Sequence, residues 1–220
     1  MKWFKSKSYP TYWENYLAQF KQTQSENLHD LRFVVFDTET TGLNTKKDRI
    51  LSIGCIAIQN LKIKVADQLE CYLIQENFNP DTVKIHGLLK EGSLKKLNEE
   101  EAILEFINYI GNSIIVAHHA SFDIAMINSS LKRMDLPKLR NKVLDTNHLF
   151  RKMKINQNKE HFSLDEIANY FSIPLHDRHT ASGDAYITAL ILLKIIAYLN
   201  KEKQYNLNDL LRSDQRIGLI

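Results

Sequence analysis

The chain has 220 residues, of which 44% are hydrophobic and 25% charged, and its net charge is +3. These values are typical of one soluble globular domain that builds its core without disulfide bonds. We expect no apolar run long enough to cross a bilayer, and the basic first five residues lack the apolar stretch of a signal peptide. We therefore expect no membrane partner and no export, and we expect a cytoplasmic protein.

Residues 1–30 are predicted to form an N-terminal helical extension. Large apolar residues recur there at helical spacing and predict an amphipathic helix over about 11–22. They are Tyr12, Trp13, Tyr16, Leu17 and Phe20. We expect this face to pack on the rest of the domain; a surface for a partner protein is the alternative.

Three β-strands are predicted next, over 33–37, 50–59 and 63–74, because these stretches are rich in Val, Ile and Leu and are divided by turn-forming residues. Short links between consecutive strands favour an antiparallel meander. Cys55 and Cys71 fall within these strands and have no CxxC partner, so we interpret both as buried, reduced thiols.

Helices and strands alternate in the second half of the chain. Capping-box patterns begin two helices, at Asn98 and at Ser163. The other predicted elements are strands over 114–117 and 143–144 and helices over 122–131 and 183–200. Asp145 is predicted to cap the segment that follows it. A meander followed by this alternation predicts an α/β fold with the first strand at the centre of a mixed sheet.

Two carboxylates, Asp37 and Glu39, lie two residues apart at the end of the first strand. Side chains at positions i and i+2 of a strand point to the same face, so these two converge. Like charges so close together repel strongly unless a cation lies between them. The pair therefore predicts a divalent metal site and metal-dependent chemistry on an anionic substrate.

Two further acids lie at the expected starts of helices. Asp123 follows the predicted strand over 114–117, and Asp184 begins the final helix. The helix dipole is an alternative explanation for both, because an acid in the first turn of a helix is stabilised by it. The dipole explains Asp37 and Glu39 less well, since these two residues end a strand.

Together with His179, the four acids form a pattern that resembles the DEDDh 3′–5′ exonucleases, the family that includes the proofreading subunit of bacterial replicative DNA polymerase. The matching segments are 37–43, 122–123 and 179–184, with 48–54 and 85–88 in support. The resemblance covers an exonuclease domain over 31–200 and leaves the extension 1–30 and a C-terminal tail, 201–220, outside it. It implies an α/β fold that is RNase H-like, with a mixed five-stranded sheet flanked by helices and the acids at one end.

The resemblance also implies catalytic roles. Two Mg²⁺ or Mn²⁺ ions would be held by Asp37, Glu39, Asp123 and Asp184, with Asp37 as the bridging ligand. His179 would be the general base that takes a proton from the attacking water. Five residues of continuous helix would turn His179 about 140° away from Asp184, so we expect His179 on a mobile loop that leads into the final helix.

By the same resemblance, six residues would hold the 3′-terminal nucleotides: Thr40, Gly42, Leu43, Ile85, His86 and Phe122. Their alternatives are turn residues, a strand-edge histidine and a core phenylalanine. His119 is a departure, because many family members have Asn before the Ala-x-Phe-Asp run. Zinc at the neighbouring histidines is disfavoured, since both cysteines lie far away in the sequence.

The implied activity is metal-dependent hydrolysis of single-stranded or frayed DNA 3′ ends to nucleoside monophosphates, in proofreading or repair. Trimming of RNA 3′ ends and catalytically silent binding of nucleic acid are the alternatives. Residues 132–159 hold nine basic residues against two acids, which suits a phosphate backbone or a solvated surface. A DNA polymerase is a further expected partner, as is a sliding clamp, because residues 215–220 loosely resemble a clamp-binding peptide.

Overall fold

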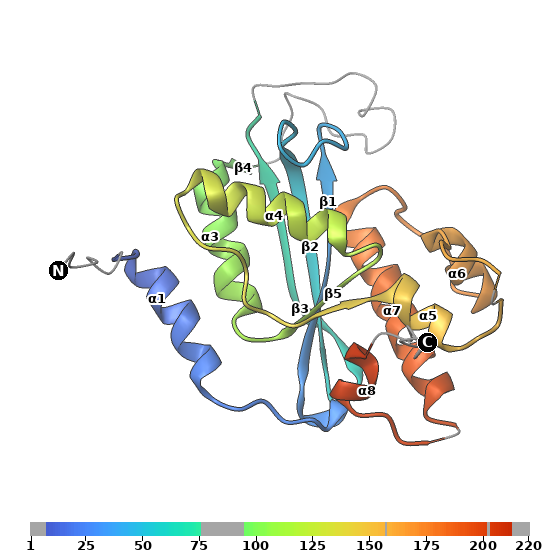
Figure 1. The fold of residues 1–220 in the computed structure, drawn as a ribbon. Helices are drawn as coiled ribbons and strands as arrows, with labels where there is room; N and C mark the ends of the chain where they lie inside the picture. Colours follow the sequence, from blue (N-terminus) through green and yellow to red (C-terminus); the bar gives the residue numbers. More distant parts are fainter. Residues whose placement is uncertain (1–7, 76–94, 157, 202, 213–220) are drawn as a thin grey trace, which may run out of the picture.

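One mixed sheet runs through the part of the chain that the structure describes, and helices cover both of its faces (Figure 1). The structure is a computed structural model, and it describes residues 8–75, 95–156, 158–201 and 203–212. The strands are β1 (Arg32–Thr40), β2 (Ile50–Gln59), β3 (Lys62–Leu73), β4 (Lys96–Leu97), β5 (Ile114–Ala117) and β6 (Val143–Asp145). Their order in the sheet is β4-β3-β2-β1-β5-β6.

Strand pairing confirms the predicted topology. The strands β1, β2 and β3 form the antiparallel meander, and β5 and β6 continue the sheet parallel to β1. The two-residue strand β4 pairs with β3 in parallel at the sheet edge. Within the described ranges, it is the one addition to the five strands that the resemblance implied. The α/β fold with β1 inside the sheet is therefore confirmed.

Helix boundaries follow local signals in the sequence. The helices are α1 (Thr11–Ala18), α3 (Glu99–Ile110), α4 (Ser121–Arg133), α5 (Thr146–Lys152), α6 (Leu164–Tyr170), α7 (Ala181–Leu199) and α8 (Leu207–Leu211), with 3₁₀ turns η1 (Gln19–Lys21) and η2 (Leu28–Asp30). The capping boxes predicted at Asn98 and Ser163 begin α3 and α6. Asp145 caps α5 by accepting a hydrogen bond from the Asn147 backbone N–H at 2.9 Å.

Alternating side chains along β1 divide the interior into two cores. Phe33 and Val35 pack on the face that α5, α6, α7 and α8 cover. Val34 and Phe36 pack on the opposite face, together with α1, α3 and α4. Successive side chains of a strand point to opposite faces, so the same alternation continues after Phe36 and determines the face to which each later residue of β1 points.

The helix α7 corrects one expectation. By length and composition it is apolar enough to cross a membrane, so the prediction that the chain has no such run was wrong. Asp184 and Lys194 interrupt the run in the sequence, so no continuous apolar stretch marks it. In the structure α7 packs against β1 and β2, and most of its apolar side chains are buried there. It is the central helix of one core.

Segments outside 31–200 also contribute to the cores. Trp13 of α1 is 0% exposed, and Tyr16 donates a hydrogen bond from its hydroxyl to Asn141 Oδ1 at 2.7 Å. The predicted packing of the N-terminal helix on the domain is thus confirmed. Leu207 and Leu210 of α8 are buried against the core around α7. The parts of these flanking segments that the structure describes, 8–30 and 203–212, therefore belong to the folded body.

Replacing Trp13 with Ala is expected to destabilise the protein by about 3–5 kcal/mol, because it leaves a large cavity in a closed core. In a domain of this length that loss lowers Tm by roughly 6–20 °C. Thermal unfolding followed by circular dichroism measures the change. Asn15→Ala, on the exposed side of the same helix, is the matched control; equal Tm values for the two variants would contradict the packing of α1.

Candidate active site

Successive side chains of β1 point to opposite faces of the sheet, and this alternation includes the polar residues at its end. Asp37 and Glu39 continue the series of Phe33 and Val35 and so point to the α7 face. There they meet Asp184, in the first turn of α7. Carboxylate oxygens of Asp37, Glu39 and Asp184 all lie within 4.8 Å of one another. We refer to these residues as the three-acid group.

A backbone contact at Gly54 brings α7 close enough to form this group. Gly54 of β2 lies opposite Asp37 in the strand ladder. A Cβ atom at this position would lie 2.3 Å from the backbone of Ala181 and Ser182, far inside van der Waals contact. Only glycine therefore lets the start of α7 rest directly on β2, with Asp184 one turn further along the helix.

Asp123 is held on the other face of β1. It lies in the first turn of α4 and is 4% exposed. Its Oδ1 accepts hydrogen bonds from the Thr38 backbone N–H at 3.1 Å and from the Thr38 hydroxyl at 2.6 Å. The structure thus gathers three of the four predicted acids around one point and places the fourth behind the same strand.

Burial and mutual repulsion disfavour the ionised form of these carboxylates. Burial raises the pKa of Asp37 well above its ordinary range, and the charges of Asp123, Asp184 and Glu39 raise it further. Burial, then the charges of Asp184 and Asp123, raise the pKa of Glu39 to about 7. Burial also raises the pKa of Asp123 to about 7, although the hydrogen bonds from Thr38 oppose it. A bound cation would offset this repulsion.

The donor atoms of the three-acid group fit a hard divalent cation. Carboxylate oxygens are the ligands that Mg²⁺ and Mn²⁺ prefer. Asp184 Oδ1 is buried and has no hydrogen-bond partner, an arrangement that is costly for an isolated oxygen but natural for a metal ligand. Within the described residues, this is the only cluster of three or more His, Cys, Asp or Glu side chains that could share an ion.

Arg178 adds a positive charge that sequence reasoning missed. Its Nη1 donates to Asp184 Oδ2, and its Nε donates to Asp165 Oδ1 at 2.6 Å. The Arg178 charge lowers the pKa values of Asp37 and Glu39, against the larger effect of burial. One signal in the sequence could have found it: a cation stands directly before the predicted histidine base.

His179 lies in a turn that leads into α7, the position predicted for it, and it is exposed. Its φ is 64°, and Asp177 has a φ of 53°, a conformation that is uncommon outside glycine. Thr180 ends the turn by accepting a hydrogen bond from the Gly183 backbone N–H at 3.1 Å. Among the described residues, no hydrogen bond joins His179 to the three-acid group, so its catalytic role stays a prediction.

Four of the six residues predicted to hold the 3′ end lie close to this site. The Thr40 hydroxyl donates to the Gly42 carbonyl at 2.9 Å and holds the turn after β1. Leu43, the next residue of the turn, is 85% exposed. Phe122 is half-buried next to Asp123 and packs against the α3–α4 core. Ile85 and His86 lie outside the described residues.

The two histidines before α4 have structural contacts. His119 has a φ of 54° and donates its backbone N–H to Asp145 Oδ1 at 3.2 Å. Both Asn and His are enriched in this conformation, which gives a backbone reason for His119 where many family members have Asn. The His118 ring contacts the Thr146 hydroxyl at 2.9 Å and the Phe162 carbonyl at 3.0 Å. Burial lowers the pKa of His118 to about 4, so its ring is neutral at pH 7.

The mixed sheet, with carboxylates gathered at the end of an inner strand, has the RNase H-like fold that the acidic motifs implied. Residues 34–192 match the sequence profile of the family described as Exonuclease. This match covers well over half of the chain, and the chain belongs to the exonuclease family. The resemblance inferred from the acidic motifs is thereby confirmed.

Similar proteins include both polymerases and separate nucleases. The PolC-type DNA polymerase III of Caldanaerobacter subterraneus subsp. tengcongensis is 34% identical over 179 residues, which are 81% of this chain and 12% of that polymerase. The chain thus spans about one eighth of the length of the polymerases it matches.

Two solved structures show the same fold. E. coli exonuclease I in complex with a dT13 oligonucleotide has a TM-score of 0.67 at 16% identity, over 78% of this chain and 42% of that one. Cell-death related nuclease 4 has a TM-score of 0.67 at 14% identity, over 79% of this chain and 66% of that one.

Glu39→Gln is expected to change how stability depends on pH in the metal-free protein. Because folding raises the pKa of Glu39 from 4.5 to about 7, the folded state binds more protons than the unfolded state between these values. The stability that the protonated Glu39 contributes is complete below pH 4.5 and is lost as the pH rises through about 7.

The Tm of Glu39→Gln minus that of the wild type should therefore grow by at least about 2 °C from pH 5 to pH 8, since 1 kcal/mol corresponds to roughly 2–4 °C here. Thermal scans in EDTA measure it. His118 acts in the opposite direction, because its lowered pKa makes stability rise with pH up to 6.5. Both proteins contain His118, so its contribution cancels in the difference between their Tm values. A difference that is constant with pH would contradict the raised pKa.

Proposed function

We propose that this exonuclease removes nucleoside monophosphates from the 3′ ends of single-stranded or frayed DNA. The observation that carries the proposal is the three-acid group, whose oxygens lie within 4.8 Å of one another at the end of β1. An exonuclease must neutralise charge on the attacked phosphate and activate a water molecule. A cluster of carboxylates that already disfavours its own ionised form is suited to hold the cations that do so.

Asp37, Glu39 and Asp184 would hold the metal ions, with Asp123 joining them from the far side of β1. Two ions, Mg²⁺ or Mn²⁺, would activate the water and stabilise charge on the leaving oxygen. Asp37 is the candidate bridging ligand, because the charges of all three other acids act on it. Thr38 fixes the orientation of Asp123 through two hydrogen bonds and so limits which of its oxygens is free.

His179 is proposed as the general base. A neutral imidazole nitrogen can take a proton from a water molecule, and histidine is the side chain that most often does so in enzymes. Its exposed position in the turn before α7 leaves it free to approach a water beside the acids. Arg178, the preceding residue, contacts Asp184, so movement of this turn and charge at Asp184 are linked.

The 3′-terminal nucleotide would lie against the turn after β1. Leu43 presents an exposed apolar side chain to a base, and Thr40 holds the turn that carries it. Phe122 would pack near the terminal sugar, and Ile85 and His86 near the last bases.

DNA is favoured over RNA because the named relatives are DNA polymerases and one structural neighbour is an exonuclease in complex with a DNA oligonucleotide. A role in proofreading or repair, a cytoplasmic location and association with a polymerase or a sliding clamp follow as parts of the proposal. RNA trimming remains the alternative function, because the same acids would cleave either backbone.

The test compares wild-type protein with Asp37→Ala on three substrates: single-stranded DNA, a primer with a mismatched 3′ end, and single-stranded RNA. With Mg²⁺ or Mn²⁺, the wild type should shorten both DNA substrates from the 3′ end and release monophosphates. Asp37→Ala should lose at least about 100-fold in rate, because it removes a principal site of charge stabilisation. Gel separation of labelled products measures both.

Asp30→Ala, an exposed acid on η2, is the matched control and should keep wild-type activity. Residual activity of Asp37→Ala within about tenfold of the wild type would contradict the two-metal site. Faster hydrolysis of RNA than of DNA would replace the proposed substrate with the alternative one.

His179→Ala is expected to lower kcat by about 10²–10⁴, the usual contribution of a general base. Binding of single-stranded DNA and of metal should largely survive, because among the described residues no hydrogen bond joins His179 to the three-acid group. Single-turnover hydrolysis and fluorescence anisotropy separate these effects. His176→Ala, an exposed histidine of the same turn region, is the control. Equal turnover in His179→Ala and wild type would remove the general-base role.

A further inference from the structure

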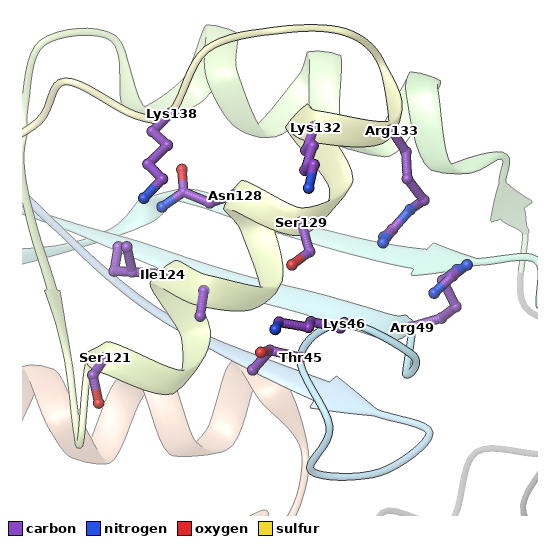
Figure 2. Close-up of a pocket in the computed structure, with 11 residues that line it drawn as sticks. Thr45, Lys46, Arg49, Ser121, Ile124, Asn128, Ser129, Lys132, Arg133 and Lys138 are labelled. Atoms are coloured by element: carbon purple, nitrogen blue, oxygen red, sulfur yellow. The ribbon is translucent and has the colours of Figure 1, made fainter.

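A groove runs along α4 on the side of the sheet opposite α7. It is bounded by α4 and by the loop between β1 and β2, and its volume is about 650 Å³. Figure 2 shows α4 crossing the view from Ser121 to Arg133, with Thr45 and Lys46 of the loop facing it. We call it the α4 groove. Its Ser121 end lies two residues from Asp123, so the groove begins beside the candidate active site.

The charges that line the α4 groove are all positive. Five of its eleven lining residues are cations, and none is acidic. Arg133 is paired with Glu99, its Nε donating to Glu99 Oε2 at 2.9 Å. Within the described part of the chain, Lys46, Lys132 and Lys138 have no carboxylate within ion-pair distance. Three unneutralised cations in one groove favour a polyanion there.

The α4 groove has the length and the uncharged hydrogen-bond donors of a surface that binds a nucleic-acid backbone. From Ser121 to Lys132 the helix rises about 17 Å, which matches about five nucleotides at 3.4 Å per nucleotide of one strand. Hydroxyl and amide groups lie between the lysines, as is common for phosphate contacts. Asn128 also fixes the far wall: its Oδ1 accepts the Leu139 backbone N–H at 3.0 Å and holds the segment of Lys138 against α4.

The kind of nucleic acid follows from what lines the groove. Proteins that bind single strands combine positive charge with aromatic side chains on which the bases stack. Among the described residues that line the α4 groove there is no aromatic side chain, and the apolar surface is that of Ile124 and Ala125. Such a groove suits a phosphate backbone whose bases are already paired and stacked on their complement.

We propose that the α4 groove binds one phosphate backbone of a double-stranded region next to the 3′ end that enters the active site. The inference rests on the proposed nuclease function and names its substrate more closely as a duplex end. Lys46, Lys132 and Lys138 contact successive phosphates, while the frayed 3′ nucleotide reaches the acids at the other side of β1.

The test measures binding of the full chain to a duplex with a short single-stranded 3′ overhang and to the single strand alone. EDTA prevents hydrolysis, and fluorescence anisotropy between about 50 and 200 mM salt gives the salt dependence. In the triple variant Lys46→Ala, Lys132→Ala and Lys138→Ala, the slope of log K against log [salt] for the duplex should fall in magnitude by about 3, or about 1 for each lysine that no longer meets a phosphate. The slope for the single strand should change by less.

The control removes three exposed lysines outside the groove, Lys21, Lys62 and Lys194, and so makes the same change in net charge. An equal decrease of slope in the two triple variants, or an equal decrease for duplex and single strand, would overturn the proposal. Hydrolysis of the single strand with Mg²⁺ is measured separately on the wild type. A protein that binds duplex through the groove but hydrolyses nothing would refute the nuclease function alone.

Discussion

Repulsion among carboxylates is the constraint on which the rest of this structure depends. Asp37, Glu39 and Asp184 lie within 4.8 Å of one another, and burial adds to the cost of ionising them. The elements that carry them gain their stability elsewhere, from apolar side chains buried in two separate cores. The acids occupy only the ends of these elements. A rigid scaffold thus keeps together charges that would separate on a flexible one.

The two faces of β1 explain why three of the four acids form one group while Asp123 is held separately. Because successive side chains of β1 alternate in direction, Asp37 and Glu39 point to the α7 face and Thr38 points to the α4 face. Thr38 then binds Asp123 on its own side. The same strand therefore separates the three-acid group from the start of the α4 groove, and a substrate that used both would bend around its end.

Short-range sequence patterns were enough to predict that Asp37 and Glu39 converge and to predict most of the fold. The i, i+2 spacing of Asp37 and Glu39, the capping boxes and the alternation of apolar residues are local signals, and the structure follows them. Contacts between distant segments were not predictable. The position of Arg178 directly before His179 could single it out, but its contacts with Asp165 and Asp184 depend on how α6 packs beside α7 and could not be predicted. The strand β4 was missed because two residues carry too little periodicity.

The backbone contact at Gly54 fixes the separation of β2 and α7 more firmly than a contact through side chains would. Where two elements meet through side chains, each rotamer that those chains can adopt changes the spacing between the elements. At Gly54 the backbone of β2 touches the backbone of Ala181 and Ser182 with no side chain between them. The separation of β2 and α7 is then fixed by main-chain atoms, which have no rotamers to sample. Thermal motion of side chains leaves the distance from Asp37 to the start of α7 almost unchanged.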